Sequence, residues 1–149
     1  MTVTSIILAG GRSSRLGREK LAEVIAGKSL IERAISSLSS LSQDILIVIS
    51  QKQARSSRSA YTYPNAKTVV DLYAEKGSLI GIYTGLVHSS NFLNLAVACY
   101  MPFLNLKLLR YMVRIAPSFD VVIPRTGDQM EPLHSVYSKN CIRPMEDQI

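Results

Sequence analysis

Residues 6–20 read IILAGGRSSRLGREK, and this stretch decides the fold. The apolar residues 3–8 predict a buried strand, which runs directly into two glycines and a loop with three arginines and a lysine. Glycine lets a backbone approach a bulky anion closely, and successive N–H groups in such a loop form an anion-binding concavity. We therefore expect a phosphate-binding loop at the carboxyl end of a first strand, where open α/β sheets place their ligands.

Two common nucleotide-binding motifs are excluded by the same residues. The dinucleotide fingerprint needs three glycines in the pattern G-x-G-x-x-G, which residues 10–15 do not supply. The Walker A loop needs serine or threonine after its lysine, whereas Lys20 is followed by Leu21. The loop is therefore a different kind of phosphate cradle.

The rest of the chain alternates short apolar strands with helical patterns. The predicted strands are residues 3–8, 44–49, 68–70, 93–99, 119–123 and 133–137, and the predicted helices are residues 29–41, 78–88 and 104–115. Residues 51–59 are polar and basic, which favours a solvated loop or a frayed helix. Strands that alternate with helices predict an α/β domain with a mostly parallel sheet and helices on both faces.

Composition limits the possible classes of protein. A chain of 149 residues predicts a single domain, residues 1–149. Its net charge is +6, and residues 1–60, with nine Lys/Arg against four Asp/Glu, carry +5 of it, which suits a polyanionic ligand. No nucleic-acid module or basic–aromatic interleaving is present, so we expect no nucleic-acid partner. The absence of a secretory signal or an apolar run of ~18 residues predicts no membrane association, and two cysteines favour a cytoplasmic protein.

The glycine loop resembles the signature of the MobA-like nucleotidyltransferases, L-A-G-G-x-S-x-R-M/L-G-x-D/E-K. The matching residues are Leu8, Ala9, Gly10, Gly11, Ser13, Arg15, Leu16, Gly17, Glu19 and Lys20. Residues 77–86 resemble the family segment G-P-L-x-G-I-x-x-G-L, with Ser78 in place of the proline, and this match points toward molybdenum cofactor guanylyltransferases. Residues 121–139 resemble a segment that shapes the acceptor side of the family's cleft.

The resemblance implies a three-layer, Rossmann-like nucleotidyltransferase fold, and it also implies a guanylyl-transfer reaction. GTP and Mo-molybdopterin would give the guanine dinucleotide cofactor and pyrophosphate. Leu8, Ala9, Gly10 and Gly11 would contact the nucleotide through their backbone. Arg15 and Lys20 would neutralise phosphate charge, with Lys20 also binding the nucleotide and stabilising the transition state. The alternatives of the same fold are a cytidylyltransferase or a sugar-phosphate nucleotidyltransferase, which nucleotide selectivity would separate.

Two features of the middle of the chain allow more than one interpretation. Asp71 follows a short predicted strand, and the resemblance places a GTP-binding aspartate there; a carboxylate can accept two parallel hydrogen bonds, as the N1–H and 2-amino edge of guanine requires. A turn-forming aspartate is the alternative. Gly81 and Gly85 lie one turn apart in a predicted helix, where each costs about 1 kcal/mol relative to alanine. Close packing onto the sheet and close approach of a flat ligand both explain them.

The chain departs from the family pattern at the expected metal ligand. Residues 95–104 resemble an apolar strand followed by D-M-P-F/L-L, in which the aspartate holds Mg²⁺, but Tyr100 stands at the aspartate position. A neutral phenol is a poor ligand for this hard cation. The chain also ends before the late N-x-N-T-P-E segment of typical members. A catalytically weakened homologue that binds nucleotide or pterin is therefore the second hypothesis.

For His134 we expect a sheet-edge or substrate contact.

Overall fold

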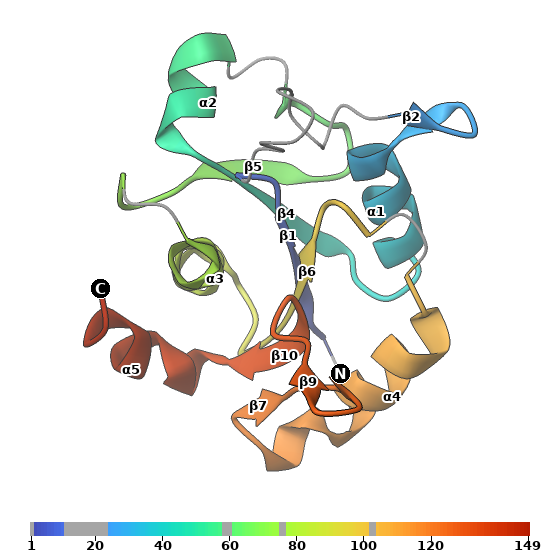
Figure 1. The fold of residues 1–149 in the computed structure, drawn as a ribbon, viewed down its shortest axis with the longest axis vertical. Coiled ribbons are helices and arrows are strands. Elements are labelled where there is room, and N and C mark those ends of the chain that lie inside the picture. Colours follow the sequence, from blue (N-terminus) through green and yellow to red (C-terminus); the bar gives the residue numbers. More distant parts are fainter. Residues whose placement is uncertain (1, 11–23, 58–60, 75–76, 102–103) are drawn as a thin grey trace.

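The computed structural model describes residues 2–10, 24–57, 61–74, 77–101 and 104–149. Its centre is a six-stranded sheet with the order β5-β4-β1-β6-β10-β7 (Figure 1). The strands are β1 (Thr4–Leu8), β4 (Asp44–Ile49), β5 (Lys67–Val70), β6 (Leu93–Ala98), β7 (Val121–Val122) and β10 (His134–Ser138). Strands β5, β4, β1 and β6 are parallel, and β10 is antiparallel to both of its neighbours. The predicted mostly parallel α/β fold is confirmed.

Helices cover both faces of this sheet. Figure 1 shows α1 (Leu30–Leu38) and α4 (Leu106–Ile115) on one face, and α3 (Ser78–His88) and α5 (Ile142–Glu146) on the other. The Tyr83 hydroxyl donates to the Glu146 carboxylate at 2.6 Å and ties α5 to α3. Two small hairpins, β2 (Val24–Ile25) with β3 (Lys28–Ser29) and β8 (Arg125–Thr126) with β9 (Gln129–Met130), lie outside the sheet. The three layers expected from the resemblance are present.

The parallel strands are apolar on both faces because each face is covered. Along β1, Ile7 packs in the cluster under α1 and α4, whereas Ile6 packs in the cluster under α3. Both side chains are fully buried. This double burial explains why these strands read as continuous apolar runs instead of an alternation of apolar and polar residues.

Helix α3 packs closely against β1 at two glycines, where no side chain separates the helix from the strand. A Cβ atom on Gly85 would lie 2.6 Å from Ile6 Cγ2, and one on Gly81 would lie 2.9 Å from Leu8 Cδ2. Of the two explanations left open by the sequence, close packing onto the sheet is the one that the structure supports.

Most element boundaries agree with the sequence-based expectations to within two residues, but the helix expected at residues 29–41 ends at Leu38, and α5 and the two hairpins were not expected. The helix at 78–88 and the strand at 44–49 have the predicted bounds. The strand expected at 119–123 is reduced to Val121–Val122. The segment expected to be a solvated loop or frayed helix contains α2 (Gln51–Ser57), and Gln53 in its first turn is buried. That expectation was wrong in one respect: one side of this polar segment faces inward.

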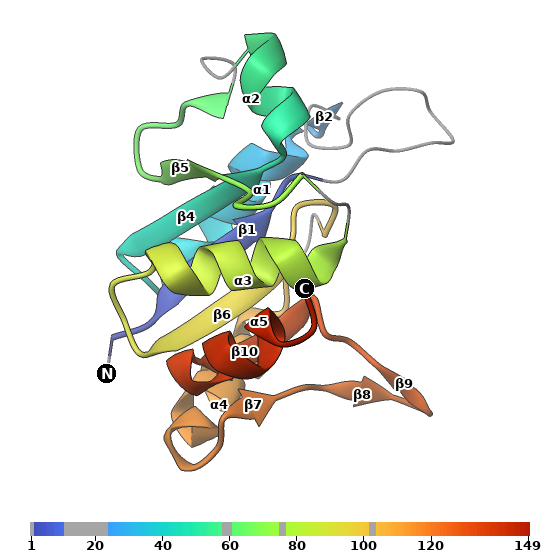
Figure 2. The same cartoon turned by 90° about the vertical axis from the view of Figure 1, so that its left-hand side faces the viewer.

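The parallel strands end at one edge of the sheet, which we call the carboxyl edge. Figure 2 shows β1, β4 and β6 running toward the edge where α3 begins and near which the β8–β9 hairpin projects. The antiparallel β10 starts at this edge, because His134 pairs with Val97 near the end of β6. The residues that follow β1, β4, β5 and β6 in the sequence therefore all lie along this edge.

Candidate functional site

Gly10 and Asp71, the ends of the two segments singled out in the sequence, meet at the carboxyl edge. Gly10 follows β1 and Asp71 follows β5, with β4 between these strands. A Cβ atom on Gly10 would lie 3.4 Å from Asp71 Oδ2 and 3.4 Å from the Ser50 nitrogen. The backbone of Gly10 therefore lies close beside the Asp71 carboxylate.

The Asp71 carboxylate is held in place but incompletely partnered. The backbone N–H of Asp71 donates to the Ile49 carbonyl at 2.8 Å. The Asp71 side chain also forms a hydrogen bond with the side chain of Thr84, which is fully buried. Within the described residues, Oδ1 is buried without a hydrogen-bond partner. Burial raises the pKa of Asp71 to about 6, and the Thr84 hydroxyl opposes this shift. At pH 7 the group is mostly ionised and has an unused acceptor, as a ligand carrying N–H groups would require.

The first turn of α2 connects the segments that contain Gly10 and Asp71. Gln53 donates to the Ala9 carbonyl at 2.9 Å, and Gln51 donates to the Asp71 carbonyl at 3.1 Å. Ser50 and Gln53 also form a reciprocal capping box, with Gln53 N–H to Ser50 Oγ at 3.1 Å and Ser50 N–H to Gln53 Oε1 at 2.7 Å. The sequence analysis missed these contacts, although the spacing S-x-x-Q is a readable sign of a capping box.

Tyr100 lies in the turn after β6, at the same edge, and its side chain is 46% exposed. The preceding residue, Cys99, donates its N–H to the Leu8 carbonyl at 3.1 Å, so this turn adjoins the end of β1. The described residues contain no group of three His, Cys, Asp or Glu side chains placed to hold a metal ion. The family that the sequence resembles implies a divalent metal, but the described residues of this edge do not fit a Mg²⁺ held by a carboxylate after β6.

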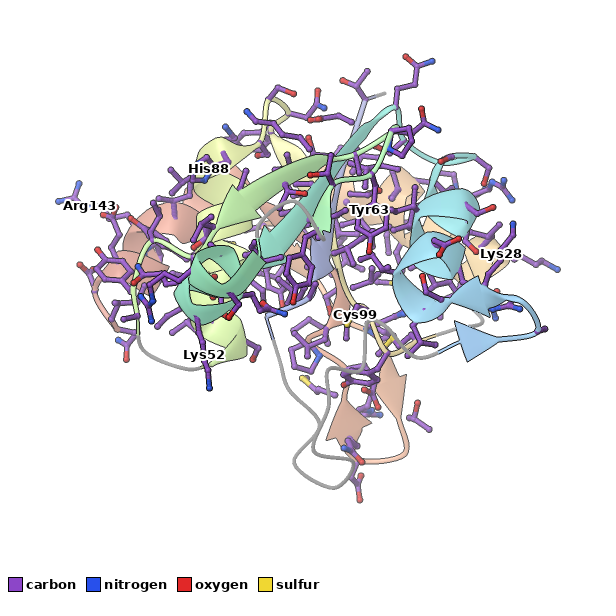
Figure 3. The ribbon with its side chains drawn as sticks, turned by 90° about the horizontal axis from the view of Figure 1, so that it is seen from above. Lys28, Lys52, Tyr63, His88, Cys99 and Arg143 are labelled. Atoms are coloured by element: carbon purple, nitrogen blue, oxygen red, sulfur yellow. The ribbon has the colours of Figure 1, made fainter. Side chains whose placement is uncertain are left out.

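The two histidines occupy opposite edges of the sheet. His134 begins β10 at the carboxyl edge, is half-buried, and has its pKa lowered by burial, which the nearby Glu131 opposes. It is therefore neutral at pH 7. Figure 3 shows His88 at the far end of α3, and Lys52 of α2 projecting on the carboxyl-edge side. His134 lies at the carboxyl edge, where it can contact a substrate. His88 lies at the other end of α3, away from this edge.

Several predicted site residues fall outside the described part of the chain. Gly11, Arg15 and Lys20 belong to residues 11–23, so their expected contacts with phosphate are not tested by the structure. Leu8, Ala9 and Gly10 are described and lie at the end of β1 as expected. The phosphate-binding loop therefore stays a prediction, although the structure describes the residues that lead into it.

Two other features of the described residues bear on function. An open groove of about 610 Å³ lies along the outer side of α4, lined by Asn105, Lys107, Leu108, Arg110, Tyr111 and Arg114. Neither Gly10 nor Asp71 lines it, so the groove is separate from the site at the carboxyl edge. Among the described helices, none combines the length and hydropathy needed to cross a membrane.

Comparison with known proteins agrees with this geometry. A family model described as the MobA-like NTP transferase domain matches residues 5–148. The "Probable molybdenum cofactor guanylyltransferase" of Pelotomaculum thermopropionicum is 34% identical over 151 residues, covering 100% of this chain and 70% of that protein. The "Molybdenum cofactor guanylyltransferase" of Desulfosudis oleivorans is 34% identical over 146 residues, covering 97% of this chain and 69% of that protein.

A solved structure has the same fold over nearly the whole chain. The molybdopterin-guanine dinucleotide biosynthesis protein A of Archaeoglobus fulgidus superposes with a TM-score of 0.82 at 29% identity, covering 99% of this chain and 73% of that one. Sequence, fold and family model thus agree on one class of enzyme. The chain belongs to the MobA-like nucleotidyltransferase family.

Proposed function

We propose that this nucleotidyltransferase is a molybdenum cofactor guanylyltransferase, which transfers GMP from GTP to Mo-molybdopterin. A terminal phosphate oxygen of the pterin attacks the α-phosphorus of GTP. The new P–O bond joins GMP to the pterin, and the bond to the β-phosphate breaks to release pyrophosphate. The names of the relatives and the match of residues 77–86 support guanine as the base.

The observation that supports this proposal is the Asp71 carboxylate beside Gly10, whose Oδ1 has no hydrogen-bond partner among the described residues. Guanine presents N1–H and a 2-amino group side by side, and a carboxylate accepts both bonds in parallel. Cytosine offers no such pair of adjacent donors, so the arrangement favours a guanylyltransferase over a cytidylyltransferase. The phosphates would then extend along the loop that begins at Gly10.

The protein's contribution to the reaction is positioning and charge neutralisation. In this proposal Leu8, Ala9, Gly10 and Gly11 bind the nucleotide through backbone groups, and Arg15 and Lys20 stabilise the charge that develops on the phosphates. None of these groups forms a covalent bond with the substrate. The test is pyrophosphate release from GTP, Mo-molybdopterin and Mg²⁺; release from CTP at the same rate would contradict the assignment of guanine.

Lys20→Ala is expected to weaken GTP binding at least ~10-fold, because a charge-assisted bond to phosphate contributes roughly 1.5–3 kcal/mol. Isothermal titration calorimetry with GTP measures the effect. Lys67→Ala is the control, since it removes the same charge from an exposed side chain at the start of β5, at the opposite edge. Equal affinities of the wild type and the Lys20 variant would show that Lys20 does not contact the phosphates.

A second candidate function, a weakened homologue that binds nucleotide or pterin, is favoured by Tyr100. Tyr100→Asp is expected to raise the rate of Mg²⁺-dependent pyrophosphate release at least ~10-fold, about 1.4 kcal/mol of barrier, because it supplies the missing carboxylate. The matched control is Tyr111→Asp on α4, where the tyrosine is 50% exposed. A wild type that turns over as fast as the Tyr100 variant would exclude the weakened homologue.

A further inference from the structure

The side-chain amide of Gln53 lies between the carboxyl ends of β1 and β4. Its Nε2 donates to the Ala9 carbonyl at 2.9 Å, and its Oε1 accepts from the Ser50 N–H at 2.7 Å. The side chain is only 5% exposed, although it belongs to a short polar helix. A buried amide with both ends bonded to the backbone of different strands needs a structural or functional reason.

This amide replaces the next backbone hydrogen bond of the parallel ladder. The ladder is regular up to the Ala9 N–H, which donates to the Val48 carbonyl at 2.9 Å. Even spacing of the bonds predicts that the following one would join the Ser50 N–H to the Ala9 carbonyl. Both of those groups bond to Gln53 instead. The amide therefore acts as a spacer that parts the two strands where the chain enters Gly10.

The glutamine amide satisfies both partners at this position. The Ser50 N–H can only donate and the Ala9 carbonyl can only accept, so the bridging group must offer one acceptor and one donor. The orientation of the Gln53 amide follows from these partners. A carboxylate would keep the bond to Ser50 but would place an acceptor against the Ala9 carbonyl, and a methionine would keep neither bond.

We infer that Gln53 is a positioning residue for the nucleotide, which parts β1 from β4 and sets the direction of the chain into the glycine loop. This inference rests on the proposed function, because the loop has a ligand to position only if a nucleotide binds there. Its neighbour Gln51 bonds to the carbonyl of Asp71, so the same helical turn also anchors the residue assigned to the base. The two halves of the nucleotide site are thereby linked through α2.

The decisive variant is Gln53→Glu, which retains the acceptor of the capping box and removes the donor to Ala9. It is expected to weaken GTP binding about tenfold, measured by calorimetry well below its unfolding temperature. Gln53→Met is expected to weaken binding at least as much. Ala54→Gly is the control, since it destabilises α2 with both amide bonds intact and is expected to lower the Tm without weakening GTP binding.

A second measurement needs no nucleotide. Amide hydrogen exchange at Ala9 is expected to accelerate in both Gln53 variants, whereas exchange at Ile6, in the middle of β1, stays as in the wild type.

Absence of GTP binding by the wild type would overturn both the proposed function and this inference. Wild-type binding that Gln53→Glu matches, or binding that falls equally in Ala54→Gly, would overturn the inference alone.

Discussion

Asp71→Asn is expected to bind GTP about 30-fold more weakly than the wild type and to be more stable at pH 8. The loss of affinity follows from replacing a carboxylate, which accepts two bonds from guanine, by an amide that presents a donor to one of them; bonds to charged groups contribute about 2 kcal/mol. The gain in stability has a different origin, because the same carboxylate is ionised in a partly buried position.

The pH dependence of stability follows from the direction of the pKa shift. The folded state raises the pKa of Asp71 to about 6 from 3.8, so it binds this proton more tightly than the unfolded chain does. The wild type therefore loses stability as the pH rises from about 4 to 6, and the deficit persists above pH 6. Asparagine does not titrate, so the Tm of Asp71→Asn should exceed that of the wild type at pH 8, and the difference should shrink toward pH 4.

Nucleotide analogues identify what Asp71 contacts. Inosine triphosphate lacks the 2-amino group, so the wild type should prefer GTP over it and Asp71→Asn should lose this preference. Exposed Asp147 offers a control, since Asp147→Asn should change neither stability nor affinity. If Asp71→Asn kept the preference for GTP but no longer distinguished it from 2′-deoxy-GTP, Asp71 would read the ribose instead of the base.

Gly85→Ala is expected to destabilise the protein by about 2 kcal/mol, although alanine is the better helix former. The new Cβ would lie 2.6, 2.7 and 3.0 Å from three side-chain atoms of Ile6, which is fully buried and branched. Overpacking of this kind costs up to about 3 kcal/mol, and the gain in helix propensity of about 1 kcal/mol offsets only part of it. Urea denaturation measures the difference.

Two further variants separate packing from helix propensity. Gly81→Ala should change stability by less than about 1 kcal/mol, because its Cβ would meet only the movable end of the half-buried Leu8 side chain. Ile6→Ala removes all three atoms that obstruct Gly85→Ala, and in that background the Gly85 change should stabilise by up to about 1 kcal/mol. An equal cost of Gly85→Ala in both backgrounds would place the strain elsewhere.

The elements that could be predicted are those whose patterns are strong and local. Helix α3 and strand β4 have the predicted bounds because apolar periodicity and flanking turn residues mark them. For the segment of α2 the expectation was a solvated loop or a frayed helix, since a short polar segment has little propensity of its own and depends on contacts such as that between Gln53 and Ala9, 44 residues apart. Polar composition alone suggested solvent on all sides of this segment.

The sequence by itself determined the family, the alternation that yields the sheet, and the strand that leads into the glycine pair. These follow from local patterns that need no knowledge of distant partners. Only the tertiary structure decided that Gly85 packs against Ile6, that Gly10 lies beside Asp71, and that the Gln53 amide lies between the ends of β1 and β4. The physical reason is that parallel strands join residues far apart in the chain, so periodicity predicts which face a side chain takes but not which partner it meets.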